Sequence, residues 1–216
     1  MSDILVIAPH PDDEVLGCGG VIKKYTKQGD SVFLCVVTKA YTPEWSGNFI
    51  KNRKKEVACA NEALGIKKTF FLDFPTVKLD TIPQKELNDS INNVVKDVNP
   101  DILYIPYEGD LCKDHRLIFE SCLVVARPLG NNIKKILAYE TLSETEWGIK
   151  QFVPTTYINI TETLEDKLKA MSCYKSELKN YPHPRSLEGI MVLAKKRGIE
   201  SGLLAAEAFI IIREIV

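Results

Sequence analysis

The chain alternates short apolar runs, rich in β-branched residues, with longer stretches of helical periodicity, and this alternation limits the folds open to it. The apolar runs predict strands at 3–8, 31–38, 68–74, 101–107, 134–140, 156–160 and 206–214. The periodic stretches predict helices at 12–28, 49–64, 83–98, 115–126, 161–178 and 186–198. Such alternation is typical of βα units around a parallel sheet. We therefore expect an α/β fold of three layers with a mostly parallel, Rossmann-like sheet.

The length and charge of the chain narrow the class of protein. Its 216 residues suffice for one sizeable core, so we expect a single domain spanning 1–216. With 28 basic and 29 acidic residues, the net charge of −1 provides no field that would hold a nucleic acid or an anionic membrane surface. No window reaches the roughly 18 apolar residues of a membrane span. We expect a cytoplasmic protein without a membrane span, and its assembly into a homo-oligomer stays open.

Six cysteines, at 18, 35, 59, 112, 122 and 173, show neither a CxxC pair nor the density of a secreted disulfide-rich scaffold. Several lie inside apolar runs such as VFLCVV. We therefore expect most of them to be buried, reduced thiols.

The stretch APHPDDEVLGCGG follows directly on the first predicted strand. Pro11 fits the first position of a helix, and the acidic residues 12–14 suit the positive end of a helix dipole. Capping leaves His10 unexplained. A second polar group, formed by Asp110, Asp114 and His115, follows the strand at 101–107. Ligands of open parallel sheets bind beyond the carboxyl ends of strands, so the two groups face one another if their strands are neighbours.

Two imidazoles and one carboxylate are the three protein ligands of many catalytic zinc sites, which leave a fourth position open for water. Successive helical residues lie about 100° apart around the axis, so Asp12 and Asp13 cannot both reach one ion from the same side. One carboxylate would bind the metal and the other would face the water. This division of roles is what metal-assisted hydrolysis needs, with zinc or another divalent ion.

The segment PHPDDE, together with DH at 114–115, resembles the zinc-dependent de-N-acetylase family called PIG-L or LmbE-like, whose members remove acetyl from N-acetylglucosaminyl compounds. Softer segments extend the resemblance over nearly the full chain: NRKKEVACANEALGI, ARPLG, YETLSETEW, PHPRSLEGI and AAEAF. The resemblance implies one Zn²⁺ per chain, a small-molecule amino-sugar substrate and no nucleic-acid partner. The implied zinc ligands are His10, Asp13 and His115, and the implied general base is Asp12.

Three further roles are expected around these residues. Glu14 closes the motif and should hold the loop through hydrogen bonds, and Asp114 should orient His115 or a neighbouring group. Many members carry HxDH where this chain reads CKDH, so Cys112 replaces a histidine that helps to stabilise the oxyanion. Either His183 or Arg185 supplies that donor instead, or activity is impaired. A third hypothesis has Cys112 reaching the metal as a thiolate.

The sequence identifies the residues that contact the substrate less clearly than it identifies the metal ligands. Arg53 and Glu56 have the i to i+3 spacing of a surface ion pair, whereas the family resemblance makes Arg53 a contact to a sugar phosphate, with Arg185 as a second substrate contact. Loops 39–48 and 141–155 are expected to form the substrate walls. Two other functions stay open: a zinc-containing sugar-binding or regulatory protein without turnover, and a nucleotide-binding Rossmann protein with an incidental acidic cluster.

Overall fold

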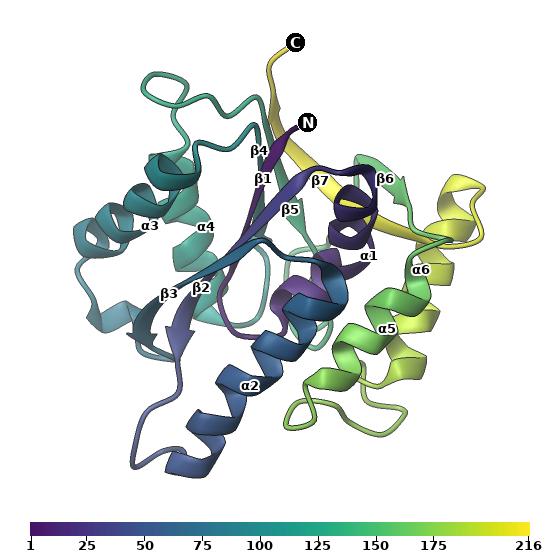
Figure 1. Ribbon diagram of the computed structural model, residues 1–216, viewed down its shortest axis with the longest axis horizontal. Coiled ribbons are helices and arrows are strands. Elements are labelled where there is room, and N and C mark those ends of the chain that lie inside the picture. The colour runs from purple at the N-terminus through teal and green to yellow at the C-terminus, as the bar shows by residue number, and fades with distance from the viewer.

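Seven strands form one sheet in the order β3-β2-β1-β4-β5-β7-β6, in a computed structural model that describes all of residues 1–216 (Figure 1). Strands β1 to β5 pair in parallel, and β7 pairs antiparallel with β5 and β6. The strands are β1 (Asp3–Ala8), β2 (Ser31–Lys39), β3 (Lys68–Pro75), β4 (Ile102–Pro106), β5 (Lys135–Tyr139), β6 (Thr156–Asn159) and β7 (Ala206–Glu214). The predicted mostly parallel, Rossmann-like α/β fold is confirmed.

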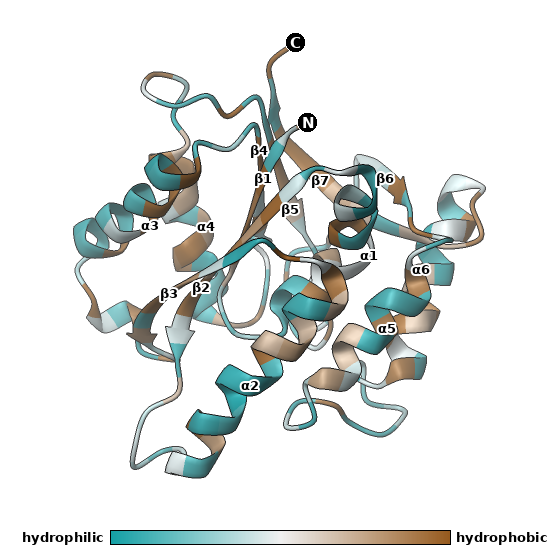
Figure 2. Ribbon diagram, viewed as in Figure 1, coloured by the Kyte–Doolittle hydropathy of each residue, from teal (hydrophilic) through white to brown (hydrophobic).

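Helices cover both faces of this sheet and complete three layers (Figure 1). One face packs against α1 (Asp13–Gln28), α2 (Gly47–Leu64), α5 (Leu164–Cys173) and α6 (Leu187–Ser201). The other packs against α3 (Gln84–Val98) and α4 (Lys113–Val125), with a short 3-10 helix at Leu79–Thr81. The hydropathy colouring shows apolar residues along the central strands and hydrophilic residues on the outer sides of the helices (Figure 2). None of the helices combines the length and apolar character needed to cross a membrane.

Most predicted helix ends lie within three residues of the observed ends, and two helices show a local reason for the difference. The first helix, predicted over 12–28 with Pro11 at its start, begins at Asp13, because Asp12 adopts a left-handed backbone with φ 109° and ends the non-helical turn. The stretch predicted as helical over 161–178 is helical only over Leu164–Cys173. Its first residues form a turn instead, in which the Thr163 hydroxyl donates to the Gly20 carbonyl.

The glycines of GCGG pack α1 closely against its neighbours. A Cβ atom on Gly17 would lie 2.2 Å from Cδ2 of Tyr139 in β5, and one on Gly20 would lie 2.8 Å from the Ile160 side chain. Larger residues would therefore push α1 away from the sheet. These glycines are helical residues rather than a phosphate-binding turn, so they do not support the nucleotide-binding alternative.

Most cysteines are free thiols, as expected, but one pair forms a disulfide. Cys18, Cys35 and Cys122 are buried and free, as expected. Cys59 on α2 and Cys173 at the end of α5 form a disulfide across 114 residues of sequence. Their wide separation in the chain gives no local signal of this contact, which arises because α2 and α5 pack side by side.

Candidate active site

The parallel pairing of β1 with β4 brings the two polar groups of the sequence together. Residues Ile4 and Val6 of β1 pair with Ile102 and Tyr104 of β4, so both strands end at the same edge of the sheet. His10 and Asp13 follow β1, while His115 lies in the first turn of α4, after β4. The expected meeting of the two groups is therefore present in the fold.

Three side-chain atoms of this edge form a nearly equilateral triangle. His10 Nδ1 and Asp13 Oδ2 lie 3.3 Å apart, His115 Nε2 and Asp13 Oδ2 lie 3.3 Å apart, and the two ring nitrogens also lie 3.3 Å apart. Ligands about 2.0–2.1 Å from a tetrahedral zinc ion are separated by about 3.3 Å. The donor set and its spacing therefore fit a tetrahedral divalent cation.

Each imidazole is oriented by a second carboxylate. Asp114 Oδ2 lies 3.1 Å from His10 Nε2 and accepts from the backbone N–H of Val77, while Asp114 Oδ1 accepts from the backbone N–H of Leu79. Asp110 Oδ2 lies 2.8 Å from His115 Nδ1. Asp114 thus orients His10 rather than His115, and Asp110, which follows β4, orients His115. Such partners fix the ring orientation and tautomer of metal-binding histidines.

Cys112 lies beside the same two imidazoles. Ligand atoms of His10, Cys112 and His115 all lie within 4.8 Å of one another, so a His-Cys-His group is a second set of atoms that could hold a metal. Cys112 precedes α4, and its backbone N–H donates to Glu144 at 2.9 Å. The thiol is half-buried and free.

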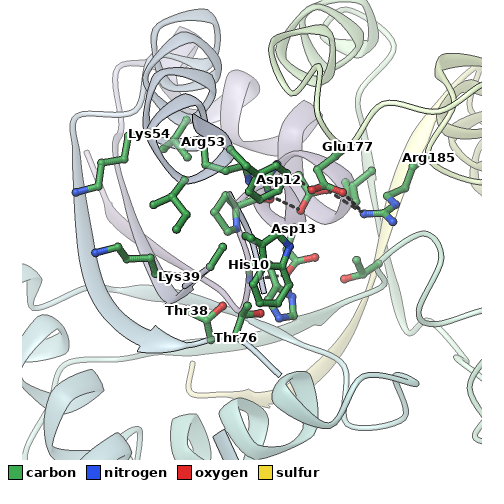
Figure 3. A pocket seen from close by; sticks show the side chains of 18 of the residues that line it. His10, Asp12, Asp13, Thr38, Lys39, Arg53, Lys54, Thr76, Glu177 and Arg185 are labelled. Atoms are coloured by element: carbon green, nitrogen blue, oxygen red, sulfur yellow. Dashed lines mark hydrogen bonds and ion pairs between the residues drawn. The ribbon is translucent and has the colours of Figure 1, made fainter. Parts of the chain in front are cut away.

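Asp12 lines the same pocket as His10 and Asp13, with its carboxylate on the side of Glu177 and Arg185 (Figure 3). Its side chain is buried, yet Oδ2 has no hydrogen-bond partner. Buried carboxylate oxygens usually accept hydrogen bonds, so one that makes none and lines a pocket is a candidate functional group. Glu14 holds the backbone here, because it accepts hydrogen bonds from the Asp12 N–H and from the Tyr174 hydroxyl.

Two arginines approach Asp12 from different elements. Arg53 of α2 lies 3.9 Å from Asp12 Oδ1, and Arg185 lies 3.6 Å from Asp12 Oδ2. Glu177 joins them, with ion pairs of 3.2 Å to Arg53 and 2.7 Å to Arg185. Arg53 also pairs with Glu56, but its side chain is only 11% exposed, so the predicted surface pair is instead part of a buried network. The Arg185 Nε donor is buried without a partner.

Not every predicted residue joins the pocket. The ring of His183 lies against Trp147, with ring centroids 6.0 Å apart, and His183 does not line the pocket. Both predicted loops do contribute to the wall, through Lys39, Ala40 and Trp45 from the first and through residues 141–144 from the second.

The surroundings of the two adjacent aspartates shift their pKa values in opposite directions. Burial and the neighbouring Asp13 carboxylate raise the pKa of Asp12, against the opposing effect of Arg53. Burial also acts to raise the pKa of Asp13, but the two imidazoles outweigh it and hold that pKa well below its usual range. A carboxylate with a raised pKa suits proton transfer near neutral pH, and one that stays ionised suits cation binding.

The motif-bearing half of the chain matches a known family. A family model described as GlcNAc-PI de-N-acetylase, PIG-L, matches residues 5–126, which include both polar groups and more than half of the chain. The chain belongs to the PIG-L family. The diacetylchitobiose deacetylase of Thermococcus kodakarensis is 30% identical over 82% of this chain and 70% of its own length. A probable N-acetyl-alpha-D-glucosaminyl L-malate deacetylase 2 of Bacillus cereus is 27% identical over 81% of this chain and 83% of its own.

The PIG-L fold is also shared with a protein named for different chemistry. The 4-carboxy-2-hydroxymuconate hydratase of Pseudomonas putida KT2440 has a TM-score of 0.80 to this chain at 19% identity, covering 100% of this chain and 98% of the other. Likeness at that level shows the fold alone, so the reaction must be argued from the residues of the site.

Asp110, which the sequence places in the second polar group without a specific role, is expected to control metal affinity in this PIG-L chain. An Asp110→Asn variant keeps the shape but weakens the acceptor that fixes the His115 tautomer at 2.8 Å. Zinc affinity should fall by about 10- to 100-fold, as measured by competition with a chromophoric chelator. Glu108→Gln is the control, since Glu108 forms only an exposed ion pair with Lys150. Equal affinities in both variants would contradict the assigned role.

Proposed function

We propose that the chain is a zinc-dependent hydrolase that removes acetyl from an N-acetylated amino sugar. The observation that carries this proposal is the divergence of two adjacent carboxylates. Asp13 Oδ2 completes a triangle with two imidazole nitrogens, while Asp12 Oδ2 lines the same pocket without a hydrogen bond, 3.6 Å from Arg185. A cation site next to a buried carboxylate with an oxygen that makes no hydrogen bond is the arrangement that hydrolysis of an unreactive amide requires.

His10, Asp13 and His115 would hold the zinc ion, with Asp114 and Asp110 fixing the two imidazoles. When bound, the ion supplies the Lewis acidity that polarises an amide carbonyl. Asp12 removes a proton from water as the water attacks the acetyl carbon. The same carboxyl group then gives the proton to the departing nitrogen, the C–N bond breaks, and the products are acetate and a free amine.

The developing oxyanion needs a further donor, because Cys112 stands where many family members have histidine. Of the two donors that the sequence suggests, Arg185 lies in the pocket and has a buried Nε–H without a partner. His183 packs against Trp147 instead. We therefore assign the donor role to Arg185, which also stays paired with Glu177 through its terminal nitrogen.

One observation favours a second candidate function. The Cys112 thiol belongs to the His-Cys-His group, and a thiolate bound to the ion would occupy the position that catalytic sites keep open. The protein would then bind zinc and an amino sugar without turning it over.

Acetate release separates the two candidates. The zinc-loaded protein is incubated with N-acetylglucosamine as free sugar, simple glycoside, disaccharide and nucleotide sugar, and acetate is quantified enzymatically. The hydrolase proposal expects stoichiometric acetate and free amine from at least one compound. Sugar binding with stoichiometric zinc and no acetate from any of them would favour the binding protein and reject the hydrolase.

A further inference from the structure

The disulfide between Cys59 and Cys173 lies next to the polar network that surrounds Asp12. Cys59 lies just after Glu56 on α2, and α5 ends at Cys173, shortly before Ser176. Glu56 accepts hydrogen bonds from the backbone N–H and from the hydroxyl of Ser176, at 2.9 and 2.7 Å. The sulfur bridge and these hydrogen bonds therefore join the same two segments, α2 and the turn that follows α5 (Figure 1).

Arg53 connects this junction to the pocket. Its guanidinium donates to the Ser176 hydroxyl at 3.1 Å and pairs with Glu177 at 3.2 Å. The same guanidinium donates to the Pro11 carbonyl and lies 3.9 Å from Asp12 Oδ1. Because Arg53 belongs to α2, a displacement of α2 relative to the turn after α5 would also move Arg53 relative to Asp12.

The part of α2 that forms the pocket wall has few other anchors. The buried residues of α2 are Val57, Ala60 and Leu64, and all three lie in its second half. Residues 47–56 contribute several side chains to the pocket, but each of them is half-buried or exposed. Segments with few buried apolar contacts open locally at a low free energy. The position of this wall therefore depends on the disulfide and on the hydrogen bonds of Glu56.

The disulfide itself can be reached from solvent. Cys59 is exposed and Cys173 is half-buried, whereas the free thiols of Cys18, Cys35 and Cys122 are buried. The fold has large apolar cores on both faces of its sheet, so it does not resemble a small scaffold that needs disulfides to fold. Exposed disulfides are more often labile and regulatory than structural.

We propose that the Cys59–Cys173 disulfide is a redox site that a dithiol reductant opens, and that its state controls the position of the α2 wall and of Arg53 in the pocket. A thiolate of the dithiol attacks the exposed Cys59 sulfur, the S–S bond breaks, and Cys173 leaves as a thiolate that takes up a proton. The second thiolate of the reductant then attacks the reductant sulfur of this mixed disulfide and releases Cys59. The protein disulfide gains two electrons, and the dithiol is oxidised to its own disulfide.

Hydrogen exchange tests the inference without requiring turnover. The zinc-loaded protein with its disulfide intact is compared with the same protein opened by reduced thioredoxin and with a Cys59→Ala/Cys173→Ala variant. In both opened forms, amides of residues 50–57 should exchange about tenfold faster, because the wall opens locally more often. Amides of α3, on the opposite face of the sheet, should exchange at unchanged rates. If the double variant loses protection in α3 as well, the protein opened by thioredoxin decides the test.

Labelling of Arg53 reports on the pocket itself. The Arg53 side chain is 11% exposed in the bridged protein, so a dicarbonyl reagent for arginine should modify it slowly. Opening of the disulfide should speed this modification about three- to tenfold, as the guanidinium leaves its partners more often. Arg116, which is exposed on α4, is the control and should react at the same rate in all forms. Thioredoxin should change neither rate in the double variant.

A thioredoxin that lacks its second reactive cysteine should be trapped on Cys59 rather than on Cys173, as shown by peptide mass mapping. A disulfide that thioredoxin does not reduce in the folded protein would overturn the inference. So would unchanged exchange over residues 50–57 together with unchanged Arg53 labelling after opening. None of these measurements depends on acetate release, so a failure of the proposed hydrolase would leave their outcome unaffected.

Discussion

Replacing Asp12 with Ala is expected to lower kcat by about 10²- to 10⁴-fold, the usual contribution of a general acid–base group, with zinc still bound. The buried Asp12 carboxylate lines the pocket with its Oδ2 free of hydrogen bonds, whereas Asp13 faces the imidazoles. The variant therefore removes proton transfer and leaves the three ligand atoms in place. Rates of acetate release are compared at equal zinc content, measured by elemental analysis.

Asp73→Ala is a matched control for this loss. Asp73 is another aspartate of the same pocket, but it is exposed and pairs with Lys39. Its replacement should leave kcat within a few-fold of the unmodified enzyme. A comparable fall in both variants would indicate a general effect of pocket charge and would remove Asp12 from the mechanism.

His115→Ala should lose both stoichiometric zinc and activity. His115 is fully buried between Asp13 and Asp110, so its removal deletes one corner of the triangle and leaves two carboxylates without their partner. Elemental analysis after dialysis reports the metal content. The third histidine provides the control: His183→Ala should keep its zinc, because His183 lies outside the cluster. Full zinc occupancy in the His115 variant would reject the ligand assignment.

Zinc affinity in this site should also fall as the pH is lowered. Burial acts to lower the pKa of His115, but the carboxylates of Asp13 and Asp110 raise it to about 10. A ring that holds its proton at neutral pH must release it before the nitrogen can bind a cation. Each decrease in pH therefore strengthens the competition between protons and the metal ion for the His115 ring nitrogen.

Local patterns suffice to predict much of this molecule. All seven strands are marked by their own apolar runs, and Gly29 and Gly65 end their helices in left-handed conformations, as their positions suggest. The meeting of His10 with His115 requires one further condition, that β1 and β4 are neighbours, and the usual order of such sheets meets it.

The remaining features depend on contacts between distant segments. Nothing near Glu177 indicates that it bridges arginines from α2 and from the loop before α6. Lys167 and Glu207 form a buried ion pair that also binds the backbone of α1, although each is surrounded in sequence by ordinary helix or strand residues. Such pairs follow from the packing of α5 and β7 against α1. The hydrophobic periodicity of the sequence does not predict which elements pack together.

The backbone of Asp12 sets a limit on how this protein can be stabilised. Its φ of 109° is a conformation that glycine adopts freely and that other residues occupy at a cost. Glycine at this position would also remove a carboxylate that is poorly solvated. Directed evolution for heat resistance alone would therefore favour glycine here, and the most stable variants of such a screen would lack the proposed general base.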